Sequence, residues 1–169
     1  MNTKLAALAF LAAGFICLPI GAGAPDGAKG GAGRTWIGIG GKFEPGETAD
    51  ECMLREVKEE TGLEITHWHY RGIVTFISDT WPNEYMHLFT ATAWRGEPDM
   101  SIDDEGELAW IRKTDLPVMP GVGNDALALW EGDRIFLRLL LDEQQPFFSL
   151  KLVYVQDEMT KAILNGKAI

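Results

Sequence analysis

The sequence predicts an α/β fold of the α+β type, with a mixed central sheet and two helices packed on it. Three observations indicate this class. Runs of aromatic and β-branched residues, typical of strands, occur at 65–78, 84–95 and 147–155. One helix, at about 49–61, is bounded by start and stop signals. A second segment, 126–141, repeats its apolar residues at helical spacing.

The bulk composition suits one globular domain, so residues 1–169 are expected to form a single unit. Of the 169 residues, 46% are hydrophobic and 24% are charged, as in ordinary domains with one core. The formal net charge of −10 argues against non-specific binding to nucleic acid or to an anionic membrane, because both need a basic face. A phosphate substrate stays compatible with this charge if a bound metal ion reverses the local field. The sequence leaves the oligomeric state open.

The N-terminal segment allows more than one interpretation. A charged start, the apolar run 5–21 and the small residues Ala22-Gly23-Ala24 are typical of a secretory signal, which would make the protein secreted or periplasmic. The alternative is two strands, 5–12 and 15–20, joined by a turn. A single membrane span is the weakest interpretation, because the apolar run is short and interrupted.

The segment 40–63, GGKFEPGETADECMLREVKEETGL, is the richest in glutamate. Thr48 and Glu51 have the spacing of a capping box, and Gly62 suits the left-handed position after a helix, so a helix is expected over about 49–61. Its spacing places three carboxylates on one side: Glu56, Glu59 and Glu60. A solvated acidic face is one interpretation. A site for a hard divalent cation such as Mg²⁺, which takes oxygen ligands, is the other.

This segment resembles the Nudix box, Gx5Ex7REUxEExGU with U aliphatic. It meets every fixed position of that box: Gly41, Glu47, Arg55, Glu56, Val57, Glu59, Glu60, Gly62 and Leu63. The resemblance implies a hydrolase of nucleoside diphosphate derivatives that depends on Mg²⁺, with Mn²⁺ as a substitute. It implies an α/β/α sandwich in which this helix and a second long helix pack on the sheet. Because Nudix domains build strands from the residues before the box, the resemblance favours N-terminal strands and a cytoplasmic enzyme.

The resemblance also implies roles for individual residues. The expected metal ligands are the backbone carbonyl of Gly40 and the carboxylates of Glu56, Glu59, Glu60 and, from a later loop, Glu105. Glu47 and Arg55 are expected to form a supporting ion pair, in which Arg55 orients the carboxylates. Glu59 is the first candidate for the base that takes a proton from water, and Glu60 and Glu105 are the alternatives.

Three outer segments, WIGIGGK (36–42), WEGDRIFLRLLL (130–141) and PFFSLKLVY (146–154), resemble the MutT-type branch, which hydrolyses oxidised purine nucleotides such as 8-oxo-dGTP. The resemblance implies that Trp130 stacks on the base and that Asp133 hydrogen-bonds its edge. Core packing for Trp130 and a surface charge for Asp133 are the alternatives.

The chain departs from this branch at two places. Ile37 stands where eukaryotic-type relatives have an asparagine, and isoleucine cannot make that amide contact with the base. A basic residue that relatives carry near the phosphates is replaced here by Leu18-Pro19-Ile20-Gly21. Either Lys29 or Arg34 substitutes for it from the loop that follows, or phosphate binding relies more on the metal ion.

The remaining expectations follow the chain. Residues 34–40 and 108–112 are expected to be strands, Gly132 is a possible break in the second helix, and 158–164 is expected to be a short terminal helix. Three histidines on strands are expected to be surface or sheet-edge residues rather than metal ligands: His67, His69 and His87.

Other functions remain open. A substrate such as a nucleotide sugar, a dinucleoside polyphosphate or capped RNA needs only a change of pocket, and the acidic charge disfavours the RNA. A nucleotide-binding module without catalysis is the alternative from another class, and the intact box argues against it. We expect a nucleotide as the partner, with no stable nucleic-acid complex and no membrane.

Overall fold

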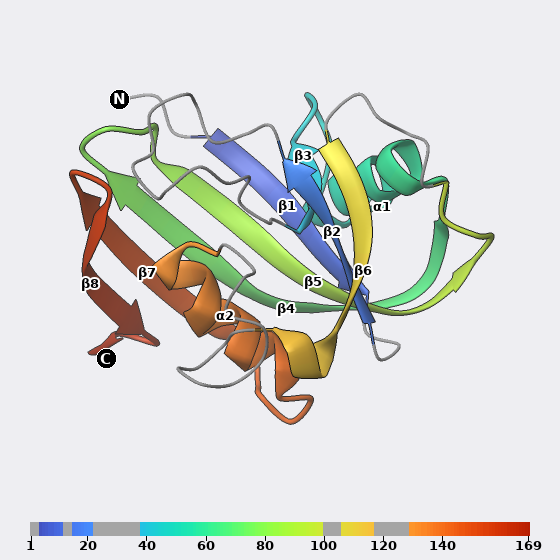
Figure 1. Ribbon diagram of the computed structural model, residues 1–169. Coiled ribbons are helices and arrows are strands. Elements are labelled where there is room, and N and C mark those ends of the chain that lie inside the picture. Colours follow the sequence, from blue (N-terminus) through green and yellow to red (C-terminus); the bar gives the residue numbers. More distant parts are fainter. Residues whose placement is uncertain (1–3, 12–14, 22–37, 100–105, 117–128) are drawn as a thin grey trace.

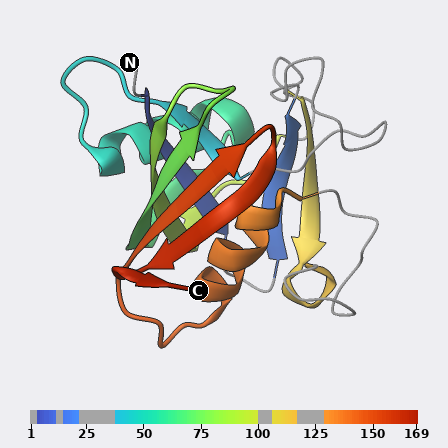
Figure 2. The same ribbon diagram turned by 90° about the vertical axis from the view of Figure 1, so that its left-hand side faces the viewer.

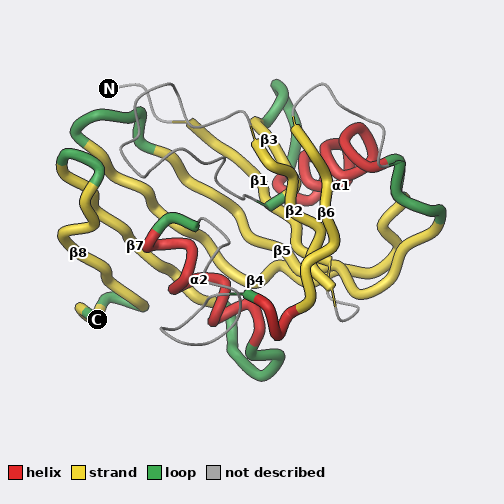
Figure 3. The backbone as a smooth tube through the Cα atoms, in the orientation of Figure 1, coloured by secondary structure: helices red, strands yellow, loops and turns green. Residues whose placement is uncertain are grey.

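A computed structural model describes residues 4–11, 15–21, 38–99, 106–116 and 129–169 of the chain. Strands dominate these residues, and two α-helices and a 3₁₀ turn accompany them (Figures 1 and 3). In chain order the elements are β1 (Lys4–Leu11), β2 (Phe15–Gly21), β3 (Ile39–Lys42), α1 (Ala49–Thr61), β4 (Glu64–Ser78), β5 (Glu84–Arg95), β6 (Gly106–Arg112), η1 (Lys113–Asp115), α2 (Glu131–Leu141), β7 (Phe148–Val155), β8 (Glu158–Leu164) and β9 (Lys167–Ala168).

The main sheet has seven strands in the order β3-β1-β5-β4-β7-β8-β9. β1 runs parallel to β5 and β4 runs parallel to β7, whereas the other neighbours are antiparallel, so the sheet is mixed, as predicted. β2 and β6 form a separate antiparallel pair. Both N-terminal segments are therefore strands, but they enter different sheets.

The two helices cover opposite faces of the main sheet (Figure 2). Each face has its own buried cluster, and successive residues of β5 show the division. Leu88 packs in the cluster under α2, with Phe136 and Leu140 of that helix. Phe89 packs in the cluster under α1, with Met53 and Val57. Adjacent side chains of a strand point to opposite faces, and the predicted α/β/α sandwich is confirmed.

Helix α1 has the predicted bounds because its signals are local. Thr48 Oγ1 accepts from the Glu51 amide at 3.2 Å, and Glu51 Oε2 accepts from the Thr48 amide at 2.8 Å. Gly62 ends the helix with φ of 73°, a conformation that glycine adopts without steric cost. Neither this helix nor α2, the two α-helices of the described ranges, is long and apolar enough to cross a membrane.

Helix α2 differs from its prediction in where it begins and in the role of Gly132. It begins at Glu131, and residues 126–128 of the predicted helix lie outside the described residues. The amide of Trp130 donates to Oδ2 of Asp133 at 3.2 Å, which places Trp130 at the N-cap and starts the helix after it. Gly132 does not break the helix, because it sits in the first turn with its amide bonded to Tyr154.

The prediction of a terminal helix at 158–164 is wrong, because this segment is strand β8. Gln156 and Asp157 have φ of 52° and 65°, and Asn165 and Gly166 have φ of 48° and 80°. Paired positive φ values are typical of the tight turns that join antiparallel strands. The chain after β7 therefore folds back twice into hairpins instead of continuing as a helix.

Candidate active site

Arg55 is the centre of a cluster of acidic groups on α1 and on the loop before it. Its Nη1 donates to Glu56 Oε1 at 2.8 Å and to Glu59 Oε2 at 3.0 Å. Its Nη2 donates to the carbonyl oxygen of Lys42, at the end of β3, at 3.1 Å. A guanidinium is planar and carries five donors, so one arginine can hold several oxygens in fixed directions.

Glu47 completes this cluster from the loop between β3 and α1. Its two carboxylate oxygens accept from Nε and Nη2 of Arg55 at 2.6 and 3.0 Å. Glu47 Oε2 also accepts from the backbone amide of Glu44 at 2.8 Å. The hydrogen bond from Arg55, followed by that from Glu44, lowers the pKa of Glu47 to about 2, so this carboxylate is charged throughout the physiological range.

Glu56 lies directly against the glycine that opens the motif. A Cβ added to Gly41 would overlap the Glu56 carboxylate, whose Oε1, Cδ and Oε2 are its nearest neighbours. The side chain of Glu56 is 14% exposed. The glycine therefore leaves the space that this largely enclosed carboxylate fills. The carbonyl of Gly40 is one of the expected metal ligands. Its residue has φ of 149°, a backbone conformation that residues other than glycine rarely adopt.

Glu59 and Glu60 follow on the same helix, in different surroundings. The side chain of Glu59 is 61% exposed, whereas Oε2 of Glu60 is buried. Within the described ranges, no three acidic, histidine or cysteine side chains are arranged to share one metal ion. Arg55 instead draws Glu56 and Glu59 to itself. The donor set is nonetheless chemically suited to a hard cation, because it consists of carboxylate and carbonyl oxygens.

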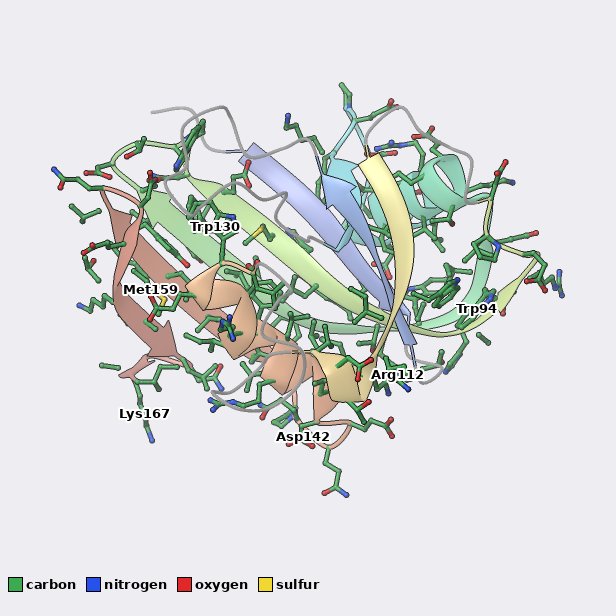
Figure 4. The ribbon with its side chains drawn as sticks, in the orientation of Figure 1. Trp94, Arg112, Trp130, Asp142, Met159 and Lys167 are labelled. Carbon is green, nitrogen blue, oxygen red and sulfur yellow. The ribbon has the colours of Figure 1, made fainter. Side chains whose placement is uncertain are left out.

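Trp130, a predicted base-binding residue, lies on the other face of the sheet, at the start of α2 (Figure 4). Asp133, the second of these residues, lies in the first turn of that helix. Trp130 contacts Tyr154 of β7 edge to face, with ring centroids 6.0 Å apart. The carboxyl group of Asp133 is enclosed, although the residue as a whole is partly exposed. Burial raises the pKa of this carboxyl group to about 7, and the hydrogen bond from the Trp130 amide opposes this rise. The structure thus brings Trp130 and Asp133 together, apart from the α1 cluster.

Several sequence-predicted residues lie outside the described residues: Lys29, Arg34, Ile37 and Glu105. The histidines are dispersed over β4 and β5. The rings of His67 and His69 meet edge to face at 5.0 Å on the exposed side of β4. His87 shares a hydrogen bond with Tyr70.

Sequence reasoning missed Tyr154. Its hydroxyl accepts from the Gly132 amide at 2.8 Å, and burial raises its pKa to about 12. The hydroxyl therefore stays neutral and holds the first turn of α2 against β7. The alternation of Leu150, Leu152 and Tyr154, all buried, was the available signal, because alternate residues of a strand share a face.

Known proteins resemble this chain in sequence and in fold. The model of the NUDIX domain matches residues 23–139, more than half of the chain. The chain is 33% identical over 119 residues to the oxidized purine nucleoside triphosphate hydrolase of Danio rerio, covering 68% of this chain and 67% of that protein. It is 35% identical over 102 residues to the NAD-capped RNA hydrolase NudC of Vibrio vulnificus (strain CMCP6), covering 59% and 37%.

A crystal structure of the mutator MutT protein from Bacillus halodurans superposes with a TM-score of 0.77 at 22% identity, over 97% of this chain and 99% of that one. This likeness shows the fold. The chain spans less than two thirds of the length of the first curated relatives that it matches. Together, the family match, the intact box and the sandwich fold show that this chain belongs to the Nudix family.

Proposed function

We propose that this protein is a Mg²⁺-dependent Nudix pyrophosphohydrolase that cleaves a nucleoside triphosphate to the monophosphate and pyrophosphate. The observation that carries the proposal is the cluster around Arg55, which fixes Glu47, Glu56 and Glu59 at the end of β3. Such a cluster gathers carboxylate oxygens in one region, and oxygen is the ligand that a polyphosphate-bound Mg²⁺ would take. The bound metal would polarise phosphoryl oxygens and lower the pKa of a water molecule.

In this proposal the charged residues of the box have separate tasks. Gly40, Glu56, Glu59 and Glu60 are the metal ligands of the described chain, and Glu105 is the candidate from the later loop. Arg55 and Glu47 are positioning residues. Glu59 remains the first candidate for the general base, because its exposed side chain can be approached by water. Glu60 and Glu105 are the alternatives.

An oxidised purine nucleotide such as 8-oxo-dGTP is the substrate that the second site supports best. Trp130 offers an indole face for stacking. Asp133, with a pKa of about 7, can donate or accept a hydrogen bond near neutral pH, which suits the changed edge of an oxidised base. Arg34 and Ile37 are the candidates for contacts to phosphate and to the base.

The test is turnover of a nucleotide panel with Mg²⁺, with separation of monophosphate and pyrophosphate by chromatography. The panel contains 8-oxo-dGTP, dGTP, the other triphosphates, ADP-ribose and a dinucleoside polyphosphate. We expect 8-oxo-dGTP to exceed dGTP about tenfold or more in kcat/KM. Glu59→Gln and Glu60→Gln should each lower kcat about tenfold or more. Unchanged turnover in both variants would overturn the proposal.

If another member of the panel is the preferred substrate, the proposal of Nudix hydrolysis stands and the proposal of specificity for an oxidised purine is wrong. A dinucleoside substrate is the second candidate, because several curated relatives bear the name of an NAD-capped RNA hydrolase. Binding of Mg²⁺ and nucleotide without turnover would point to a sensing module instead. The cellular location, for which we propose the cytoplasm, requires fractionation of the native host.

A further inference from the structure

Four aromatic rings form a continuous surface on the face of the sheet that α1 covers in part. The ring of Tyr70 on β4 lies 5.6 Å from that of His87 on β5 and 5.2 Å from that of Phe147, just before β7. The ring of His87 lies 5.3 Å from that of Phe43. We call these four residues, Phe43, Tyr70, His87 and Phe147, the aromatic shelf.

Two of the four rings of the shelf are exposed to solvent. Tyr70 is 38% exposed and Phe147 is 54% exposed. Beneath them Phe89 is fully buried and stacks on Tyr70, with ring centroids 4.7 Å apart and planes 20° from parallel. Stacking on Phe89 fixes the plane of Tyr70. The ring of Phe147 stands nearly perpendicular to Tyr70, with planes 89° apart, so the two exposed rings form a corner that suits a planar base stacked on one ring with its edge against the other.

The shelf is joined to the Nudix loop through Phe43. This residue directly follows Lys42, whose carbonyl accepts from Arg55. It precedes Glu47, which Arg55 also holds. The loop that carries the proposed catalytic cluster therefore also carries the first ring of the shelf. A ligand seated on the shelf would lie beside the loop that faces the phosphates.

The shelf has polar groups at its edge. The Tyr70 hydroxyl and Nδ1 of His87 share a hydrogen bond. Asp50, in the first turn of α1, accepts from Nε1 of Trp68 at 2.7 Å. Burial, and then the charge of Asp50, raises the pKa of Tyr70, and burial lowers the pKa of His87 against the effect of the same carboxylate. The Tyr70 hydroxyl and the His87 ring nitrogens are the polar groups of the shelf that can pair with the edge of a purine.

We propose that the aromatic shelf is a second base-binding subsite, which takes the purine at the far end of a substrate with two nucleosides joined by a polyphosphate. This inference rests on the proposed function, because it assigns the leaving part of the substrate. Trp130 and Asp133 hold a base on the opposite face of the sheet in that function. The shelf adds a site on the α1 face that a nucleoside triphosphate does not fill.

The experiment measures binding and needs no turnover. The probes are methylene-bridged analogues of diadenosine tetraphosphate and of ATP, titrated by calorimetry in Mg²⁺. The two-base probe should bind the wild type about tenfold or more tightly than the one-base probe, since one stacked base contributes about that much. Tyr70→Leu and Phe147→Ser should each remove most of this preference.

Val155→Ser is the matched control for Phe147→Ser. Val155 is 45% exposed and ends β7, whereas Phe147 directly precedes that strand. The two residues lie about 26 Å apart along the strand, so Val155→Ser should keep the preference. Equal Kd values for the two probes in the wild type, or equal losses in Val155→Ser and Phe147→Ser, would overturn the inference.

The remaining outcomes separate this inference from the proposed function. Hydrolysis of nucleotides with equal binding of the two probes would overturn the shelf alone. A preference for the two-base probe without any hydrolysis would overturn the hydrolase proposal alone. If Tyr70→Leu lowers the mass measured by sedimentation equilibrium and leaves the probe preference, the shelf is an interface between two copies of this chain.

Discussion

Arg55 and Glu47 form a two-point ion pair, in which Nε donates to Oε1 at 2.6 Å and Nη2 donates to Oε2 at 3.0 Å. The remaining donor group, Nη1, contacts Glu56 and Glu59. The side chain of Arg55 is 23% exposed, so solvent screens this network less than an ordinary surface pair. The pair fixes the loop before α1 and leaves one nitrogen to orient the carboxylates of the helix.

The first prediction concerns Arg55→Lys. A lysine keeps the charge but offers one nitrogen, which cannot reach Glu47 at two points and also hold Glu56 and Glu59. We expect kcat to fall about tenfold or more with circular dichroism unchanged. The control is Arg112→Lys, because Arg112 is 67% exposed and pairs with Asp115 on the surface. Steady-state kinetics of both variants with equal loss of kcat would contradict the special role of Arg55.

The second prediction compares two glycines. In Gly41→Ala the new methyl group would overlap the Glu56 carboxylate. We therefore expect weaker Mg²⁺ binding, seen as a higher Mg²⁺ concentration for half-maximal activity, with a small change in the free energy of unfolding. In Gly132→Ala the new methyl group would overlap Leu152 and lie 2.8 Å from the Tyr154 hydroxyl, so we expect a loss of about 1–3 kcal/mol of unfolding free energy. Urea unfolding and Mg²⁺ titration of activity check the pair. A reversed pattern would show that Gly41 serves packing.

The parts of the fold that could be predicted depend on signals close in sequence. Thr48, Glu51 and Gly62 fix α1 by contacts within the helix ends, so its bounds follow from the sequence alone. Asn165-Gly166 is a comparable local signal for a hairpin. The apolar residues Met159 and Ile163 have a spacing that fits a helix as well as a strand, so the apolar pattern of 158–164 does not separate the two, and the helix predicted there is wrong.

The parts that could not be predicted depend on register. The β4–β5 pairing shifts between Tyr70 and Gly72. Alternation counted back from Val74, which packs under α2, would place Tyr70 on that same face. The shift instead turns Tyr70 to the α1 face, where it stacks on Phe89. Alternation along the strand does not reveal such a shift. The aromatic shelf was not foreseen for the same reason, and because its four rings come from four separate segments of the chain.

The third prediction concerns pH. The enclosed carboxyl of Asp133 has a pKa of about 7 in the folded protein, raised by burial from the ordinary 3.8. Between these pH values the folded state holds a proton that the unfolded state has lost, so stability falls as pH rises from about 4 to 7 and then levels off. Asp133→Asn should remove this slope, and Glu131→Gln, exposed on the same helix, should keep it. Urea midpoints at pH 5 and 8 test this, and identical slopes in all three proteins would show that Asp133 does not titrate in this range.

The fourth prediction concerns the end of α2. Arg71 is 9% exposed, and its guanidinium donates to the carbonyl oxygens of Leu139, Leu140 and Asp142 at 3.5, 3.3 and 2.6 Å. These carbonyls belong to the last turn, which has no partners within the helix. The carbonyl of Asp142 also accepts from the Gln145 amide at 3.0 Å. Arg71→Met should therefore remove the charged donor from the carbonyls of Leu139 and Leu140, and lower the unfolding free energy by about 2 kcal/mol, or Tm by about 4–8 °C.

Arg138→Met is the control for this change, because Arg138 is exposed on the same helix and its loss should change stability by less than about 0.5 kcal/mol. Differential scanning calorimetry of both variants gives the comparison. Since the buried guanidinium joins β4 to the end of α2, Arg71→Met should also speed amide exchange in the last turn of α2 before it affects α1. Uniform acceleration in both helices would mean that Arg71 stabilises the whole sandwich rather than this junction.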